Sequence, residues 1–430
     1  MSDSDRDRAA QPAASSPAAP SDGPPAADQP LRTSDANGHE AAFELTDADF
    51  PPIESPRPAR LPGPGLLEAA AWTAGTILVH VVAVVLVLSG LFLIEPDMWR
   101  AGLSLERVLE AGYGTILVGG EQLVFVIVAA VAVALRLRMS HNSSVLDARL
   151  ALSRGRHAAS NGGAGRLSLE RIPPAHAALI LCLVLPVALL VTKGHEAFAD
   201  VWNQVARSVP GMDQVESARV LELLHASLKG ASLPTLVFIL AVLPAIGEEL
   251  VFRGVVARGL TARWGLVGGV LLTSLLFAAA HPDPVHAVGV FPLGVVIHLT
   301  YLATRSFWAP VLYHFLNNSL AAAGLWAASQ LDEQQATEAV LRSPAMPATV
   351  YVAAAVCAVS LLRLLWRTRV EHVLPDGTLW TPGYATAEAP PAAVESFRVC
   401  RRAATGDYVF AAAGVMAFAA ALVHALWPAA

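Results

Sequence analysis

The chain has 430 residues, of which 54% are hydrophobic and 15% are charged, and its formal net charge is −6. These proportions exclude a soluble globular protein and favour a polytopic membrane protein, so the lipid bilayer is the first expected partner. The charge balance lacks the basic footprint of a nucleic-acid-binding protein, and we expect no nucleic-acid partner. The three cysteines predict no disulfide framework.

Residues 1–65 are rich in Ala, Pro, Ser and Asp and contain few large apolar side chains. This composition predicts a disordered N-terminal tail. The tail has no short apolar core with a cleavage site, so we expect the first hydrophobic segment to be retained as an anchor. The bias toward Ala, Pro and Arg points to a bacterial source and hence to the inner (cytoplasmic) membrane.

Hydrophobic segments of about 20 residues, the length that a helix needs to cross the hydrocarbon core, predict an all-α bundle with about nine transmembrane spans. The segments are 68–94, 114–135, 174–193, 232–256, 264–281, 285–304, 307–327, 347–366 and 408–427. Arginine gathers in alternate loops, which predicts a cytoplasmic N-terminus.

Four regions follow from this pattern: the tail (1–65), the first spans (66–230), a central core (231–330) and the last spans (331–430). Within the second region, residues 196–230 have apolar side chains at helical spacing and predict amphipathic helices outside the bilayer. Within the fourth, 370–407 contains Asp-Gly and Pro-Gly pairs and predicts a small cytoplasmic insert of short strands and turns. No internal repeat of fixed period is present, which argues against an inverted-repeat transporter.

Polar side chains inside membrane spans are costly, so they are the first candidates for function. Those that stand out all lie between residues 247 and 318: Glu248, Glu249, Arg253, His281, His314 and Asn318. Glu249 and Arg253 are four residues apart on one helix face and can neutralise each other. Glu248 lies about 100° around the helix and stays unpaired, which makes it the candidate general base.

His314 and Asn318 are also four residues apart, so both project from one helix face and could bind a metal or donate to an oxyanion. If segments 232–256 and 264–281 form a hairpin that turns near 262–265, Glu248 and His281 come level with each other. His314 fits this level less well. It lies only about nine residues after the turn between segments 285–304 and 307–327, whereas Glu248 and His281 lie about 15 and 17 residues from theirs, at 1.5 Å per residue. A helix broken at residues 281–284 (HPDP) would reconcile the depths.

Structural interpretations compete with these roles. An isolated Glu–Arg pair can simply lock two helices, and the single histidines His80, His176 and His298 are expected to be structural. Asn317 is expected to be a packing neighbour of Asn318. The convergence of a glutamate, two histidines and an asparagine from three spans favours a functional site.

The three patterns resemble one known family. EELVFR matches E-E-x-x-x-R, FAAAH matches F-x-x-x-H and HFLNN matches H-x-x-x-N, in the order found in the CPBP intramembrane endopeptidases. That family includes type II CaaX prenyl proteases and bacteriocin-processing or self-immunity (Abi) proteins, and the resemblance covers residues 230–330. It implies that Glu248 and His281 activate a water and that His314 and Asn318 stabilise the oxyanion. Glu249 with Arg253 would hold the base in place.

The resemblance leaves the cofactor open between none and zinc. Metalloprotease descriptions of the family would make Glu248, His281 and His314 the metal ligands, whereas a metal-free glutamate mechanism uses the same residues. A carboxamide is a poor zinc ligand, and the helical H-E-x-x-H motif is absent: His195-Glu196 is not followed by x-x-H. Motifs of rhomboid-type serine and aspartyl intramembrane proteases are also absent.

We therefore expect an intramembrane endopeptidase that acts on a membrane-associated protein or peptide, although a prenylated substrate is not expected in a bacterium. A catalytically silent scaffold or regulator of the same fold is the alternative. A transporter would need acidic residues on several spans, and only one span carries them.

Overall fold

The computed structural model describes residues 61, 63–95, 105–153, 167–209, 226–281, 283–331, 346–381, 384–390 and 394–427. The predicted disordered tail lies outside the described residues except for its last few positions. The second half of the predicted amphipathic segment, residues 210–225, and the loop at 332–345 also lie outside them.

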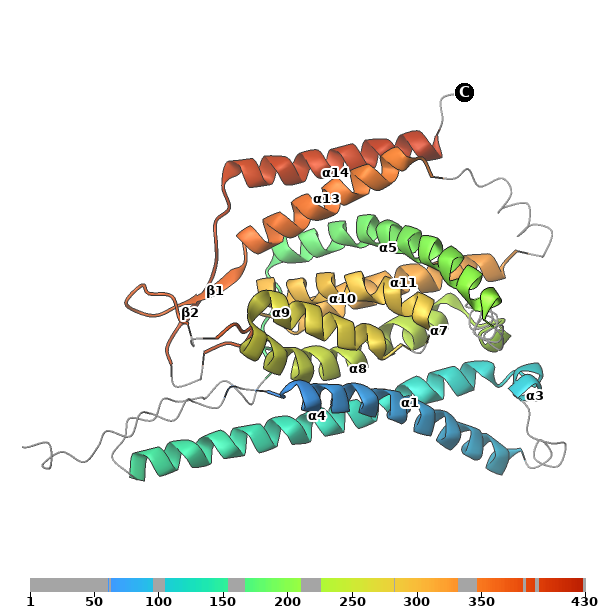
Figure 1. Ribbon diagram of the computed structural model, residues 1–430, viewed down its shortest axis with the longest axis horizontal. Helices are drawn as coiled ribbons and strands as arrows, with labels where there is room; N and C mark the ends of the chain where they lie inside the picture. Colours follow the sequence, from blue (N-terminus) through green and yellow to red (C-terminus); the bar gives the residue numbers. More distant parts are fainter. Residues whose placement is uncertain are drawn as a thin grey trace, which may run out of the picture. The chain divides into compact units, whose positions relative to one another are not determined.

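The described chain is helical apart from one small sheet, which confirms the predicted all-α class (Figure 1). The first helices are α1 (Leu66–Ile94), α3 (Leu105–Glu110), α4 (Gly114–Ser153) and α5 (Pro174–Ser208). The central run comprises α7 (Leu233–Val237), the π-helix η2 (Phe238–Val242), α8 (Leu243–Val251), the π-helix η3 (Phe252–Val256), α9 (Ala257–Ala279), α10 (Pro284–Thr304) and α11 (Trp308–Ser329). The last elements are α13 (Ala348–Arg367), β1 (Val370–Val373), β2 (Phe397–Cys400) and α14 (Thr405–Leu426).

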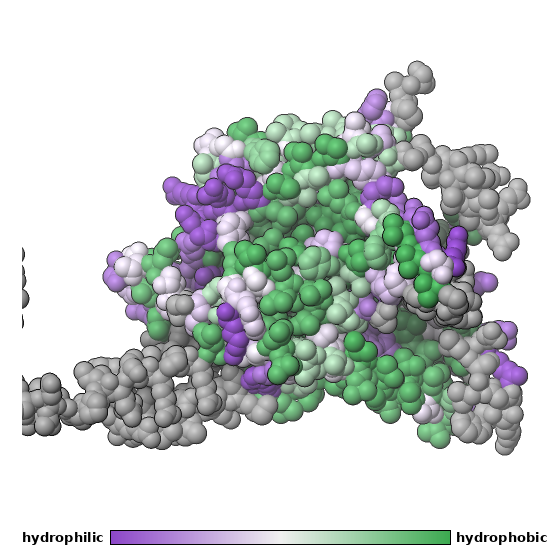
Figure 2. Space-filling model, viewed as in Figure 1, coloured by the Kyte–Doolittle hydropathy of each residue, from purple (hydrophilic) through white to green (hydrophobic). Residues whose placement is uncertain are grey.

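Seven helical runs in the described part of the chain are long and apolar enough to cross a membrane. They are Leu66–Ile94, Gly114–Arg138, Pro174–Ser208, Leu233–Ala279, Pro284–Thr304, Ala348–Arg367 and Thr405–Leu426. Hydrophobic side chains cover most of the face shown in Figure 2, and hydrophilic ones gather toward its two ends. The protein is therefore an integral multi-pass membrane protein.

Seven runs and nine predicted spans differ in two places. Helix α11 has 22 residues but is not among the apolar runs, because its first turns carry polar side chains. The predicted spans 232–256 and 264–281 form one continuous run of 47 residues. The number of crossings therefore depends on whether this long run turns back.

The long run does turn back, at Gly265. This glycine has φ 68° and ψ −171°, a conformation that an L-residue rarely adopts. The rings of Phe252 and Phe277, 25 positions apart in the sequence, nevertheless pack edge to face with centroids 5.0 Å apart. A Cβ atom on Gly269 would lie 2.4 Å from the Cα atom of Thr261, so the two arms touch backbone to backbone beside the turn. The predicted hairpin is confirmed.

A proline shapes the start of this hairpin. Pro244 has no backbone N–H, so the Leu240 carbonyl four residues earlier cannot receive its usual helical hydrogen bond. The chain forms the π-helix η2 over Phe238–Val242 at this point. A second π-helix, η3, follows α8, so both π-helices flank the turns that carry Glu248 and Glu249. Such interruptions are frequent at functional sites.

Packing places the hairpin in the middle of the bundle. Helix α9 packs against α10, α10 packs against α5 and α11, and α11 also contacts α7, η2 and α8. Helix α4 covers α8 from another side, and α13 lies between α5 and α14 (Figure 1). Helix α5 is continuous from Pro174 to Ser208, so the break expected between a span ending at 193 and a separate amphipathic helix is not present.

The predicted insert contains a two-stranded antiparallel sheet in which Val370 pairs with Cys400 and Val373 with Phe397. The predicted Asp-Gly turn follows β1, with Gly377 at φ 84°. The insert is anchored on the helices: buried Glu388 forms an ion pair with buried Arg258 of α9, and Arg398 donates to the Thr304 carbonyl at 2.7 Å.

Candidate functional site

Three of the candidate side chains form a buried ionic cluster. Arg253 donates through Nη1 to Glu249 Oε1 at 2.8 Å, and His314 Nδ1 donates to the same oxygen at 2.9 Å. Glu249 and Arg253 are 0% exposed and His314 is 3% exposed. Arg253 also donates through Nη2 to the Gly294 carbonyl at 3.0 Å, so the cluster joins the hairpin to α10 and α11. A buried carboxylate with two cationic or donor partners meets the requirement that buried charges be compensated.

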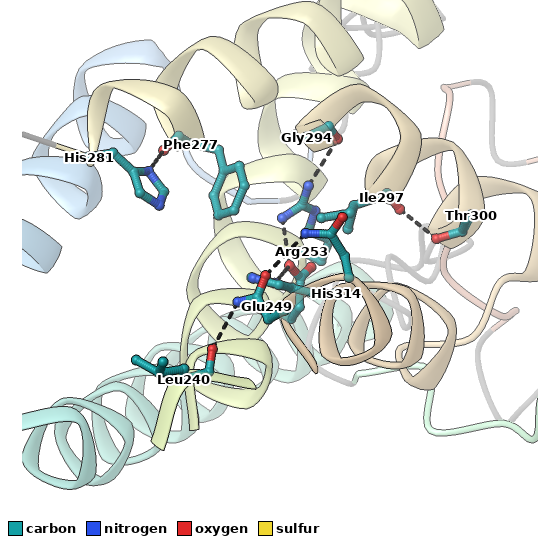
Figure 3. Close-up of polar contacts among 11 residues, drawn as sticks. Leu240, Glu249, Arg253, Phe277, His281, Gly294, Ile297, Thr300 and His314 are labelled. Carbon is teal, nitrogen blue, oxygen red and sulfur yellow. Dashed lines mark hydrogen bonds and ion pairs between the residues drawn. The ribbon is translucent and has the colours of Figure 1, made fainter. Parts of the chain in front are cut away.

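Phe277 forms the apolar centre of the site (Figure 3). The Arg253 guanidinium carbon lies 4.8 Å from the centre of its ring. The imidazoles of His281 and His314 both meet the ring edge to face, with centroids 5.3 Å and 5.9 Å away. The phenylalanine of the F-x-x-x-H pattern thus separates the two histidines and fixes both rings.

The depth of His314, which the sequence left unresolved, has a geometric explanation. Arg258 and Arg305 both bind Glu388, the first through the carboxylate and the second through the backbone carbonyl, so they lie at one level. Glu249 lies nine residues before Arg258, and His314 lies nine residues after Arg305. The hairpin tip at Gly265 therefore extends about seven residues, or about 10 Å, beyond the α10–α11 turn. A broken helix is not needed to bring His314 to Glu249.

Glu248 forms no hydrogen bond or ion pair with the three clustered side chains, although its charge acts on Arg253. Its side chain is half-buried, and its buried Oε2 atom has no hydrogen-bond partner among the described residues. Phe125 of α4 lies against neighbouring Gly247, where a Cβ atom would be 2.6 Å from the phenylalanine ring. The predicted separation of an ion-paired Glu249 from an unpaired Glu248 matches this geometry.

His281 follows the last turn of α9 and bonds through Nδ1 to the Phe277 carbonyl at 3.0 Å. A carbonyl oxygen only accepts, so Nδ1 carries the hydrogen and Nε2 of the neutral ring keeps its lone pair. His286 on the first turns of α10 lies beside it, with ring centroids 5.1 Å apart. The sequence patterns did not single out His286, because it belongs to none of the three; its proximity to HPDP was the available signal.

Asn318 bonds to a backbone carbonyl within the π-helix η2. Its Nδ2 donates to the Leu240 carbonyl at 3.1 Å, the carbonyl that Pro244 leaves without a helical donor. Its Oδ1 accepts from Asn317 at 3.2 Å, which agrees with the structural role expected of Asn317. An amide nitrogen carries two hydrogens, so the second hydrogen of Asn318 Nδ2 stays available to a ligand. Pro244 frees the carbonyl to which Asn318 donates, and no sequence motif shows this relation between the two residues.

The geometry does not fit the zinc site that the family resemblance left open. In the described part of the chain, no three His, Cys, Asp or Glu side chains come together closely enough to hold a metal ion. The ring of Phe277 contacts both His281 and His314, and Nδ1 of His314 is bonded to Glu249. We therefore derive no step through a metal from Glu248, His281 and His314.

The three histidines expected to be structural each have a polar neighbour outside the site. His80 of α1 bonds to Glu121 of α4, and His176 of α5 lies 3.0 Å from the Thr368 carbonyl. His298 is fully buried, with Nε2 3.4 Å from Thr261 Oγ1.

The fold and the site define a polytopic helical membrane protein with a compensated ionic cluster beside an unpaired carboxylate. Residues 230–320 match the model of a family described as type II CAAX prenyl endopeptidase Rce1-like. This match confirms the predicted resemblance over the part of the chain that contains all six candidate residues.

One curated protein is similar to the chain over a limited length. It is a protein of Bacillus subtilis (strain 168) named "Putative membrane peptidase YdiL", which is 22% identical over 109 residues. The aligned segment is 25% of this chain and 42% of that protein. No solved structure matches the chain.

Proposed function

We propose that the protein is a glutamate-dependent intramembrane endopeptidase that hydrolyses a peptide bond in a membrane-associated protein or peptide. The observation that carries the proposal is that Glu249 is held through Oε1 by Arg253 and His314, whereas the neighbouring Glu248 has no ion pair with a described residue and keeps a buried Oε2 without a hydrogen-bond partner. Unpartnered buried carboxylate oxygens are costly, and such groups concentrate at functional sites. The Rce1-like match and the membrane peptidase similarity support the same reaction class.

In this mechanism Glu248 takes a proton from a water held between its carboxylate and Nε2 of His281. The oxygen of that water forms a bond to the scissile carbonyl carbon, and the carbonyl becomes an oxyanion. Glu248 then returns the proton to the amide nitrogen as the C–N bond breaks, so that one water is consumed and an acid and an amine are released.

His314 and Asn318 would stabilise the oxyanion. The free hydrogen of Asn318 Nδ2 supplies one donor. His314 supplies the other through Nε2, which donates when the ring carries both protons, since Nδ1 already bonds to Glu249. Losing one such donor costs about 10² to 10³ in rate in well-studied hydrolases. The pair Glu249–Arg253 sets the orientation of His314 and holds α8 against α10.

The alternative of a silent scaffold remains the competing function. A scaffold would need the ionic cluster for folding, but nothing in a scaffold would require the half-buried Glu248 to stay without an ion-pair partner. A transporter finds less support. The expectation that only one span carries acidic residues is wrong, because Glu121 lies within the span Gly114–Arg138, but this carboxylate is already bonded to His80.

The experiment compares cells that produce the wild-type chain with cells that produce Glu248→Gln or His281→Ala. Mass spectrometry of the new termini of membrane proteins detects cleavage of whichever substrate the cell contains. We expect termini that appear with the wild-type protein and are lost in both variants. Glu196→Gln, which changes an exposed carboxylate paired with Lys193, serves as the control and should retain the termini.

Identical termini in wild type and Glu248→Gln, with all proteins present at equal levels in the membrane, would support the scaffold and refute the protease.

A further inference from the structure

A basic pocket lies between α13 and α14, apart from the six candidate residues. Its volume is about 700 Å³, and four arginines line it: Arg363, Arg367, Arg401 and Arg402. Figure 2 shows hydrophilic side chains gathered over the left-hand ends of these two helices, where α13 ends and α14 begins in Figure 1. Because both helices are membrane spans, these arginines lie at the level where a span meets the polar surface of the bilayer.

The charges in the pocket are only partly compensated. Arg363 pairs with Asp407 at 2.8 Å, the one acidic residue of the lining, so four arginines and one aspartate leave three positive charges. Arg401 lies 3.5 Å from Glu371, but Arg369 holds the same carboxylate oxygen at 2.7 Å.

Two of the arginines have no anionic partner in the described part of the chain. Arg367 and Arg402 are exposed, and neither has an ion pair or a hydrogen bond to another described residue. Guanidinium groups bind phosphate through paired N–H donors, so two unengaged guanidinium groups at one pocket favour an oxyanion of that kind.

The lining of the pocket is apolar on the side that lies further inside helices α13 and α14. Val359 lies one helical turn before Arg363 and is 60% exposed, and Phe410 on the second turn of α14 is 40% exposed. An occupant would therefore meet positive charge at one end and hydrocarbon-facing side chains at the other. A phosphate group carrying acyl chains has this distribution, whereas a free phosphate ion has only the first part.

We propose that this pocket is a binding site for an anionic phospholipid, whose phosphate contacts Arg367 and Arg402 and whose acyl chains lie along Val359 and Phe410. Basic pockets between transmembrane helices bind anionic headgroups in this way. The site lies on the α13–α14 pair, which contacts the central hairpin indirectly through α5 and α10, so lipid binding is separate from the proposed hydrolysis.

The test measures lipid binding by the purified full-length protein in detergent. The probes are phosphatidylglycerol, phosphatidylcholine with the same acyl chains, and inorganic phosphate, and the readouts are the melting temperature and the number of lipids retained in native mass spectrometry. For the wild type we expect that phosphatidylglycerol raises the melting temperature and is retained, and that the other two probes do neither. The variant Arg367→Gln with Arg402→Gln should lose the effect.

An arginine near an anionic lipid surface contributes roughly 5-fold to affinity, so the double variant should bind phosphatidylglycerol roughly 30-fold more weakly. The control replaces two exposed basic residues that do not line the pocket, Arg138→Gln with Lys229→Gln, and should bind like the wild type. Equal melting temperatures of all variants without added lipid would show that folding is intact.

Equal binding by the pocket variant and the control would overturn the proposal, as would a preference that does not distinguish the two lipids. Stabilisation by inorganic phosphate at the level of phosphatidylglycerol would assign the pocket to a soluble phosphate instead. If the double variant does not fold even without added lipid, the single variant Arg402→Gln takes its place in the test, because Arg402 lies outside the helices.

Discussion

At the scale of single residues, two adjacent glutamates have opposite environments. Glu249 is fully buried and its Oε1 is bonded to both Arg253 and His314, whereas Glu248 is half-buried and has no ion pair with a described residue; the Oε2 atoms of both lack a hydrogen-bond partner among the described residues. A helix turns by about 100° between neighbours, so one side chain can point into a compensated cluster while the other faces away from it. This separation leads to two different predictions for the same chemical substitution.

Glu248→Gln should remove activity and leave stability unchanged. The amide has the same shape as the carboxylate but cannot accept the proton of water, and general-base catalysis contributes about 10² to 10⁴ in rate. Folding should suffer little, because Arg253 keeps its hydrogen-bonded partner Glu249 in this variant. Terminal-peptide analysis measures the activity and thermal unfolding in detergent measures the stability; a large drop in melting temperature would show that Glu248 is structural.

Glu249→Gln should instead destabilise the protein. The change leaves the Arg253 guanidinium as an uncompensated buried charge, which costs about 3–5 kcal/mol when one partner of a buried pair is removed. Glu196→Gln is the control, because it breaks an exposed ion pair with Lys193 in which both side chains are more than half exposed, and little change is expected. Denaturant titration of both variants in mixed micelles provides the comparison, and equal stabilities would contradict the assignment.

The sequence predicted the Glu249–Arg253 pair because both residues lie on one helix and local geometry decides their contact. It did not predict that His314 joins them, since that contact depends on how far the hairpin tip extends beyond another turn. The bond from Asn318 to the Leu240 carbonyl was hidden for a related reason. It fills a vacancy created by Pro244, 74 positions earlier in the sequence.

At the scale of elements, the α8–α9 hairpin brings the glutamates and His281 into one site, and its closure depends on small residues. The backbone at Gly269 approaches Thr261 so closely that no Cβ atom fits between them. Gly265 supplies the reversal through its positive φ angle. The motif residues are thus held by two glycines that carry no chemistry themselves.

Gly269→Ala should open this hairpin. The added methyl group would meet Thr261 backbone atoms at 2.4 Å and 2.7 Å, and backbone cannot move aside cheaply, so we expect a loss of about 1–3 kcal/mol together with reduced activity. Gly324→Ala on α11 is the matched control, because its Cβ atom would meet nothing within 4 Å and alanine favours a helix. Melting temperatures that move equally in both variants would argue against the close contact.

The insert offers a prediction about pH. Burial lowers the pKa of His372 to about 4, and the nearby positive charges of Arg305 and Arg398 act in the same direction. The folded state therefore favours the neutral ring, so this contribution to stability is complete above the ordinary pKa of 6.5 and is lost as the pH falls toward about 4.

Hydrogen exchange of residues 370–400 should accordingly increase more between pH 7 and pH 4.5 in the wild type than in His372→Phe, which keeps a ring but does not titrate. Comparing the two proteins at each pH removes the intrinsic pH dependence of exchange. The same increase in both would assign the loosening to groups other than His372.

At the scale of the whole molecule, the described contacts connect one set of helix ends. The start of α1 binds the hairpin tip through Arg263 and the Pro64 carbonyl, and Arg136 near the end of the α4 span binds Glu68. The residues before α5 bind the α10–α11 turn, where Ser306 donates to the Glu170 carbonyl. The insert binds both turns through Glu388.

Counting crossings from this common end leads us to expect nine passes. The run Leu233–Ala279 contributes two passes because it reverses at Gly265, and α11 contributes one because it starts at the same end and has 22 residues, or about 33 Å. With the other six apolar runs of the described chain, we therefore predict nine passes. The hydropathy pattern could place the segments, but only the contacts between their ends show which ends lie together.

Nine passes place the two ends of the described chain on opposite sides of the membrane. The connected end carries the arginines, so we expect it in the cytoplasm together with the insert, as the positive-inside rule predicts. A fluorescent protein inserted at the exposed Asp376-Gly377 turn should fluoresce if this turn is cytoplasmic as predicted. Alkaline phosphatase fused after Leu426 should be active, because it requires the oxidising exterior. Phosphatase activity at the insert together with fluorescence at the C-terminus would show that the topology is the reverse of the predicted one. Fluorescence at both positions would show that α14, the one helix between them, does not cross the membrane.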